Sequence, residues 1–117
     1  MKFVIQGQLP DMNEIIKASK SHYGAYSSMK KKYTEIVAWS AINLPIIESA
    51  DFEIVWYCKN KRKDKDNIRA GLKFILDGIV QAGKLENDGW KQVGDISDRF
   101  EVDKNNPRIE VIIKPRG

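Results

Sequence analysis

The chain has 117 residues, enough for one domain with a modest core, and its 42% apolar and 31% charged residues are typical of a soluble globular protein. The net charge of +4 favours an acidic partner if the cations cluster. One cysteine, Cys58, and one histidine, His22, exclude an intramolecular disulfide, a cysteine-based zinc site and a histidine-rich metal site. No apolar run approaches transmembrane length, and the start lacks a signal peptide's apolar core. We therefore expect a cytoplasmic protein without membrane contact.

The first half of the chain predicts a strand followed by a helix. Apolar and polar residues alternate over Lys2–Gln8, which is typical of a strand. The polar segment Asp11–Lys20 is expected to hold one turn of helix, before a polar loop. Apolar residues at three-to-four spacing then predict a helix from Ser27 or Ser28 to about Asn43.

The second half predicts three strands and one more helix. Asp51–Cys58 is rich in β-branched and aromatic residues and predicts a strand, and Asn67–Ala82 has the apolar face of an amphipathic helix. Lys91–Asp103 and Arg108–Lys114 predict two strands, which we expect to form an antiparallel hairpin. The order strand-helix-strand-helix-strand-strand predicts a single α+β domain over residues 1–117, with helices packed on a mixed sheet.

The stretch KNKRKDKDNI, residues 59–68, places two aspartates inside a run of cations. If the preceding strand continues through it, Asp64 and Asp66 point to one side and Lys63 and Lys65 to the other. Asp66 also stands where the N-cap of the following helix is expected. On local residues alone, a solvated loop with a capping aspartate is the commoner explanation.

Two later residues, Lys73 and Asp88, are further candidates for a site at this stretch. Lys73 follows Asp66 by seven residues, nearly two helical turns, so its long side chain would share a helix face with the aspartate. Its alternative is a surface ion pair with Asp77. Asp88 lies in a turn-like segment after the helix, where it either approaches the other two carboxylates or only forms the turn.

Aspartates without histidine or cysteine partners suit a hard cation, Mg²⁺ above all, that also binds substrate phosphates. Such a metal supports phosphodiester hydrolysis. The surrounding cations would then contact the nucleic-acid backbone. The expected DNA-binding residues in the stretch are Lys59, Lys61, Arg62, Lys63 and Lys65. Lys30, Lys31 and Lys32 either add to that surface or form a solvated helix face.

These motifs resemble the RusA-type Holliday junction resolvases, especially their phage and prophage branch. The similarity covers nearly the whole chain in order, and its most specific part is the Asp-x-Asp-Asn helix start at residues 64–67. The matching segments are LPDMNE (9–14), KKYTE (31–35), KDKDNI (63–68), KFILD (73–77) and ND (87–88).

The resemblance implies a homodimeric endonuclease that uses Mg²⁺, with Mn²⁺ as a substitute, and cuts four-way DNA junctions by paired nicks in strands of like polarity. Asp64, Asp66 and Asp88 match the metal-site aspartates, and Lys73 matches the essential lysine, which would steady the scissile phosphate. Asn13 and Asn67 match recurrent positions, and we expect supporting roles for them.

One departure from the family pattern concerns the basic residue. The spacing from Asn67 to Lys73 is three residues longer than in a well-studied bacterial member, so Arg69 competes for the role of Lys73 or binds phosphate. Asp95 and Asp98 are lesser metal candidates. The alternatives to a resolvase are a DNA-binding protein without catalysis, a nuclease acting on flaps or forks, and a protein-interaction domain.

Overall fold

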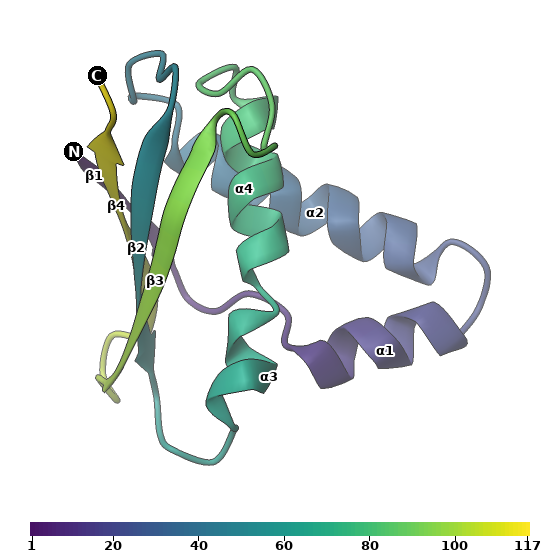
Figure 1. Ribbon diagram of the computed structural model, residues 1–117. Helices are drawn as coiled ribbons and strands as arrows, with labels where there is room; N and C mark the ends of the chain where they lie inside the picture. Colours follow the sequence, from purple (N-terminus) through teal and green to yellow (C-terminus); the bar gives the residue numbers. More distant parts are fainter.

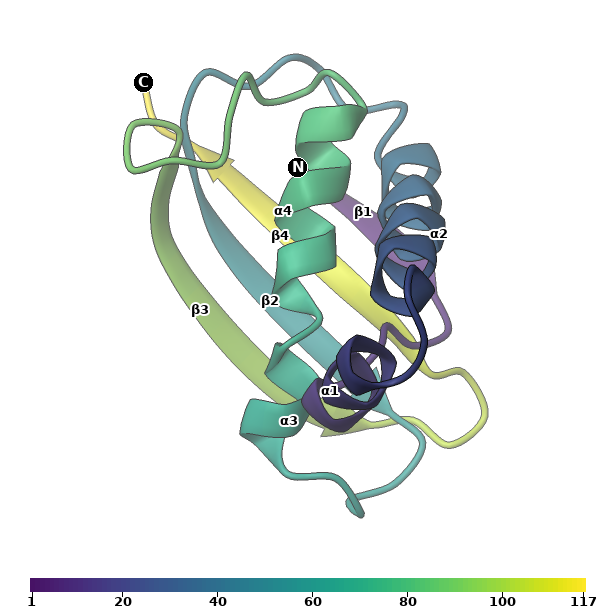
Figure 2. The same cartoon turned by 90° about the vertical axis from the view of Figure 1, so that its right-hand side faces the viewer.

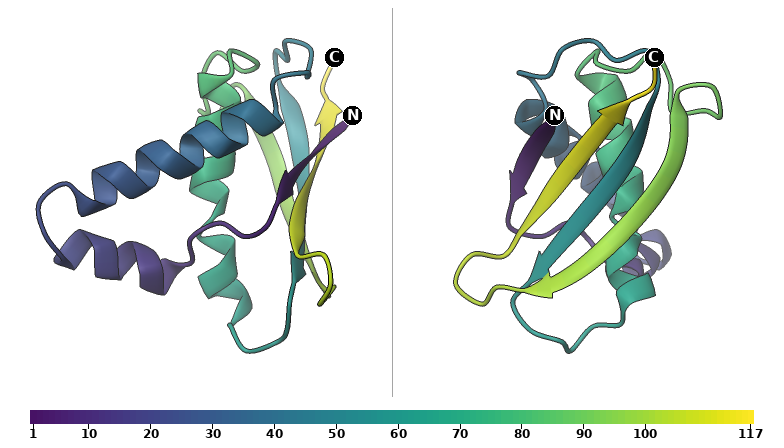
Figure 3. Two further views of the ribbon diagram at one scale, coloured as in Figure 1. Left: turned by 180° about the vertical axis from the view of Figure 1, so that it is seen from behind. Right: turned by 60° about the vertical axis from the view of Figure 1, so that its left-hand side comes forward.

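The sheet of this protein is mixed and has four strands, in a computed structural model that describes all residues 1–117. The strands are β1 (Lys2–Gln6), β2 (Ala50–Cys58), β3 (Val93–Val102) and β4 (Arg108–Pro115), in the spatial order β1-β4-β2-β3. β4 is antiparallel to β1 and β2, whereas β2 and β3 are parallel. The right-hand view of Figure 3 shows β2 between β3 and β4.

The expected hairpin of the last two strands is wrong. β3 and β4 lie on opposite sides of β2, and the connection between them passes the lower end of β2 in Figure 1. The physical reason is burial: β2 buries consecutive residues, Ile54, Val55 and Trp56, on both faces, so it takes a central position. β3 alternates half-buried and exposed residues, which suits an edge strand.

The helices all lie on one side of the sheet, as Figures 1 and 2 show. They are α1 (Met12–Lys20), α2 (Ala25–Ser40), α3 (Lys65–Arg69) and α4 (Leu72–Gln81). A cluster of 18 buried apolar residues joins this sheet face to α2 and α4. The α+β class predicted from the sequence is confirmed, as one domain. No helix has both the length and the apolar character needed to cross a membrane.

Helix α1 has nine residues rather than the single turn expected from the sequence. Asp11 accepts a hydrogen bond from the amide of Glu14, and the Glu14 side chain accepts one from the amide of Asp11. This reciprocal capping box stabilises the start of the helix.

The helix expected over Asn67–Ala82 is broken into α3 and α4. The break falls at Ala70 and Gly71, where a side chain on Gly71 would lie 3.0 Å from Leu9 and 3.2 Å from the Trp56 ring. Gly71 therefore lets the chain pass directly over Trp56, and the axis changes where the backbone makes that close approach.

Candidate metal and nucleic-acid site

The acidic residues of the basic stretch stand at the start of α3, which the chain reaches through a loop after β2 ends at Cys58. Neither the continued strand nor an N-cap at Asp66 is found: Asp64 is the N-cap, and α3 begins at Lys65. Asp64 makes no capping hydrogen bond, and the Asp66 side chain accepts one from the amide of Asn67 at 3.0 Å. Both aspartates are exposed. Residues two apart on a helix do not share a face, so the same-side arrangement expected from a strand is lost.

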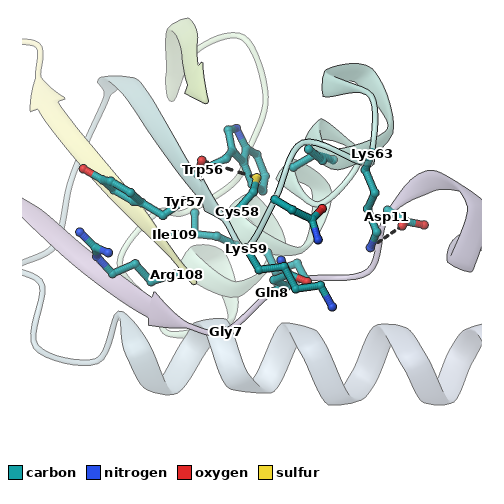
Figure 4. A pocket seen from close by; sticks show the side chains of 13 residues that line it. Gly7, Gln8, Asp11, Trp56, Tyr57, Cys58, Lys59, Lys63, Arg108 and Ile109 are labelled. Atoms are coloured by element: carbon teal, nitrogen blue, oxygen red, sulfur yellow. Dashed lines mark hydrogen bonds and ion pairs between the residues drawn. The ribbon is translucent and has the colours of Figure 1, made fainter. Parts of the chain in front are cut away.

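Helix α1 holds the loop before α3 through an ion pair. The Lys63 ammonium lies 2.8 Å from the Asp11 carboxylate and 3.6 Å from that of Glu14. Figure 4 shows Lys63 reaching from the loop to Asp11. A second contact holds α3 itself, because the amide of Asn13 donates to the Asn67 side-chain oxygen at 3.1 Å. The structure thus brings the two expected supporting residues, Asn13 and Asn67, together where α1 meets α3.

The Asp11–Lys63 pair shifts the pKa of both groups. Burial alone would raise the pKa of the Asp11 carboxyl, but hydrogen bonds from Lys63 and the Glu14 amide, with the Lys63 charge, bring it below its usual value. The hydrogen bond to Asp11 raises the pKa of Lys63. Both groups therefore carry full charge near neutral pH, and Lys63 holds the loop in place.

The other side of α3 is fastened to the sheet through Asp98 of β3. Its carboxylate accepts from the Arg69 guanidinium at 2.6 Å and from the Trp56 indole at 2.9 Å. The Asp98 side chain is mostly buried, and both oxygens are engaged. Arg69 is therefore ion-paired with Asp98. The other lesser metal candidate, Asp95, has its carboxylate 3.5 Å from the Arg116 guanidinium.

Asp88 does not join the other two aspartates within one chain. β2 runs down to the loop before α3, and α4 carries the chain back to the opposite end of the sheet, where residues 82–92 form a loop (Figure 1). At that end the amide of Ile47 donates a hydrogen bond to the carbonyl of Lys84. The nine residues of β2 separate the two ends by about 26 Å. The expected approach of Asp88 to Asp64 and Asp66 is therefore wrong for a single subunit.

Lys73 lies in the first turn of α4, beyond the break at Gly71. Its ammonium is 3.9 Å from Asp77, and Lys30 of α2 approaches the same carboxylate oxygen at 3.9 Å. No ion pair joins Lys73 to Asp64 or Asp66. The alternative expected from the sequence, an ion pair between Lys73 and Asp77, is present, and its distance of 3.9 Å is long for an ion pair.

The cations of the basic stretch divide into two groups. Lys63 is held by Asp11, and Arg69 by Asp98. The others make no ion pair, and Lys65 lies 5.6 Å from the centre of the Phe100 ring. The unpaired cations around α3 are Lys59, Lys61, Arg62 and Lys65. On α2, Lys31 is also unpaired, and Lys32 lies over the ring of Tyr33.

The donors at the start of α3 are two carboxylates, the ligand type that a hard cation prefers, although they do not share a helix face. No group of three or more histidine, cysteine, aspartate or glutamate side chains is assembled for a metal within the chain. Asp64 and Asp66 remain as exposed oxygen donors, and neither makes an ion pair. Mg²⁺ is commonly bound by one or two carboxylates, with water and substrate phosphates filling the other positions.

The sequence interpretation missed the structural roles of Asp11, which holds the loop, and of Asp98, which binds both Arg69 of α3 and Trp56 of β2. It had treated Asp98 only as a lesser metal candidate. Asp11 carries a readable signal, since Asp-x-x-Glu at residues 11–14 is a capping-box pattern. Asp98 has no local signal, because its partners come from elements far apart in the sequence.

No protein-family model matches this chain, and no curated protein matches it.

Proposed function

We propose that this protein is a Mg²⁺-dependent endonuclease that resolves four-way DNA junctions by paired, symmetric phosphodiester hydrolysis. The observation that carries the proposal is that charged side chains of both signs around α3 lack ion-pair partners. Asp64 and Asp66 make no ion pair, and the neighbouring Lys59, Lys61 and Lys65 make none.

This arrangement suits a ligand that satisfies both signs of charge. A phosphate backbone would neutralise the lysines, and a divalent cation would neutralise the aspartates. Such a metal would supply a Lewis acid and an activated water for phosphodiester hydrolysis. Asp64 and Asp66 would hold the metal, while Lys59, Lys61, Arg62 and Lys65 would position the backbone of the substrate.

The other residues around α3 have separate roles in positioning the site and the scissile phosphate. Lys63 holds the loop through Asp11, and Arg69 holds α3 through Asp98, so both act as positioning residues. We assign the scissile phosphate to Lys73, because its contact with Asp77 at 3.9 Å is long enough to be exchanged for a phosphate. Asn67 and Asn13 set the position of α3 against α1.

A two-fold homodimer suits the substrate, because it presents two identical sites to two symmetric strands. We also propose a cytoplasmic location, in a bacterial or phage-infected cell, as the resemblance to phage and prophage resolvases implies. The second candidate is a DNA-binding protein without catalysis. It is favoured by one observation: a single chain assembles no third carboxylate beside Asp64 and Asp66.

The test uses four labelled substrates: a four-way junction, a matched linear duplex, a flap and a fork. Each is incubated with the protein in Mg²⁺ or in chelator, and the products are mapped to the nucleotide. We expect paired nicks at symmetric positions of the junction, in Mg²⁺ only, and slower or no cutting of the other three substrates.

Other outcomes change the assignment. Faster cutting of the flap or fork would make the protein a nuclease for a different branched structure. Tight junction binding in chelator and in Mg²⁺ without any cutting would contradict catalysis and support the DNA-binding candidate. Equal, weak binding to all four substrates with little salt dependence would contradict nucleic-acid function altogether.

A further inference from the structure

The carboxylate of Asp77 lies between two lysines where α4 packs against α2. The ammonium groups of Lys73, one turn earlier on α4, and of Lys30, from α2, each lie 3.9 Å from the Oδ2 atom of Asp77. That oxygen is buried and accepts no hydrogen bond. Elsewhere in the protein, the Lys63 ammonium and the Asp11 carboxylate approach to 2.8 Å. Asp77 therefore shares two distant cations, although one close cation would neutralise it.

Packing between α2 and α4 fixes the position of this carboxylate. The rings of Tyr33 on α2 and Phe74 on α4 lie 6.0 Å apart, and a side chain at Gly78 would overlap Val37. Phe74, Asp77 and Gly78 are three or four residues apart, so they share the face of α4 that α2 covers, and Figure 2 shows the two helices side by side. Only 23% of the Asp77 side chain is exposed as a result.

The Asp77 carboxylate needs one of the two lysines but not both. The loss of both cations would leave an uncompensated charge beside α2, which is costly. Each contact alone is weak, because both lysine side chains are about half exposed. Lys73 is the more exposed, and it stands in the first turn of α4, where the helix dipole disfavours a cation and favours an anion beside it. Lys73 therefore leaves Asp77 at the lower cost, provided that Lys30 stays.

We propose that Lys30 is a positioning residue for Lys73. It neutralises Asp77 when the Lys73 ammonium turns to the scissile phosphate, so that this movement leaves no unpaired carboxylate between α2 and α4. Without Lys30, Asp77 has a single cation and holds it more firmly. The movement to a phosphate rests on the proposed function, whereas the sharing of Asp77 between two lysines does not. Lys30 thus serves the reaction without contact with the DNA.

The first test needs no DNA and follows the reactivity of the Lys73 amine. Acetic anhydride acetylates the neutral amine, and a carboxylate beside an ammonium group favours the charged form. With the rate read by mass spectrometry, Lys30→Met should lower the acetylation of Lys73 by about two- to fivefold, and Asp77→Asn should raise it. Thr34→Val is the control and should keep the rate, because it changes the same helix contact at a buried hydroxyl without a hydrogen bond. An unchanged rate at Lys73 in Lys30→Met would overturn the proposal.

The second test measures single-turnover cleavage of a four-way junction in Mg²⁺ and its binding in chelator. Lys30→Met should cleave about two- to fivefold more slowly and bind with the affinity of the wild type. Addition of Asp77→Asn to Lys30→Met should restore the rate, because a neutral amide no longer holds Lys73. A loss that came only from damaged packing of α2 would not be reversed by a second substitution in the same contact. Thr34→Val should cleave like the wild type.

Other results would contradict this role. If Lys30→Met weakens binding, lowers its salt dependence and is not rescued by Asp77→Asn, Lys30 is a DNA contact and not a positioning residue. If the acetylation rate changes but cleavage does not, Lys73 does not exchange Asp77 for a phosphate in the reaction. A wild type that cuts no junction would overturn the proposed function and the role at the phosphate, whereas the acetylation rates would still decide whether the two lysines share Asp77.

Discussion

Individual charged residues around α3 serve either structure or a ligand, and their partners distinguish the two. Lys63 lies 2.8 Å from Asp11 and is committed within the chain, whereas Lys59 and Lys61, in the same loop, have no ion-pair partner. A sequence pattern treats these lysines alike. The difference arises because α1, which supplies Asp11, packs beside the loop, and that contact is not encoded in the stretch itself.

The Asp11–Lys63 pair predicts a specific dependence of stability on pH. Asp11→Asn keeps the capacity for an N-cap but removes the charge, and we expect it to cost about 0.5–1 kcal/mol near neutral pH, since Lys63 is partly exposed. The pKa of Asp11 is lowered in the folded protein, so its contribution is complete above the usual 3.8 and is lost as the pH falls through the lower folded value.

The measurement is urea unfolding of wild type and Asp11→Asn from pH 7 down to pH 2.5. The two stabilities should converge as the pH falls below about 4. Lys17→Gln, on an exposed position of α1, serves as a control and should not show this convergence. A constant difference at every pH would show that the loss comes from packing rather than from the ion pair.

The unpaired lysines predict a change in the salt dependence of DNA binding. For the double variant Lys59→Gln/Lys61→Gln, the slope of log K against log salt concentration should fall by about 1 for each lost phosphate contact. Lys20→Gln, an exposed cation at the last residue of α1, is the matched control and should keep the slope. Fluorescence anisotropy with a labelled junction in chelator gives the slope, and an unchanged slope in the double variant would remove these lysines from the DNA surface.

At the scale of elements, the sequence predicts which segments are regular better than how they connect. The strand before Cys58 and the helical character of the region after it follow from local patterns. The break at Gly71 does not, because Ile68, Leu72 and Ile75 continue one apolar stripe across it. The hairpin was expected because consecutive strands usually pair, and the central burial of β2 overrode that tendency.

Helices α2 and α4 depend on a close approach at Gly78. A side chain there would overlap Val37 of α2, and both residues are buried. Gly78→Ala should therefore destabilise the protein by about 1–3 kcal/mol through overpacking. Gly89→Ala is the control, since its added carbon would meet only ordinary contacts at 3.6 Å. Urea unfolding compares the two, and equal stability would contradict the tight packing of α2 on α4.

At the scale of the whole molecule, the sheet has helices on one face and leaves the other uncovered, with the acidic pair at one end. The acidic pair and its basic surround were predictable from the sequence, because the Asp-x-Asp-Asn pattern is local. The place of Asp88 was not, since it depends on the parallel pairing of β2 with β3. That pairing requires the chain to return to the opposite end of the sheet before β3 begins.

We propose that carboxylates at the start of α3 hold the metal for DNA cleavage. The most direct measurement is the single-turnover cleavage rate of a four-way junction in Mg²⁺ by Asp66→Asn, beside the wild type and Glu48→Gln, which changes an exposed acid without an ion pair. We expect Asp66→Asn to lose at least about a hundredfold in rate while it still binds the junction, and Glu48→Gln to cleave like the wild type. Cleavage by Asp66→Asn at the wild-type rate would contradict the claim.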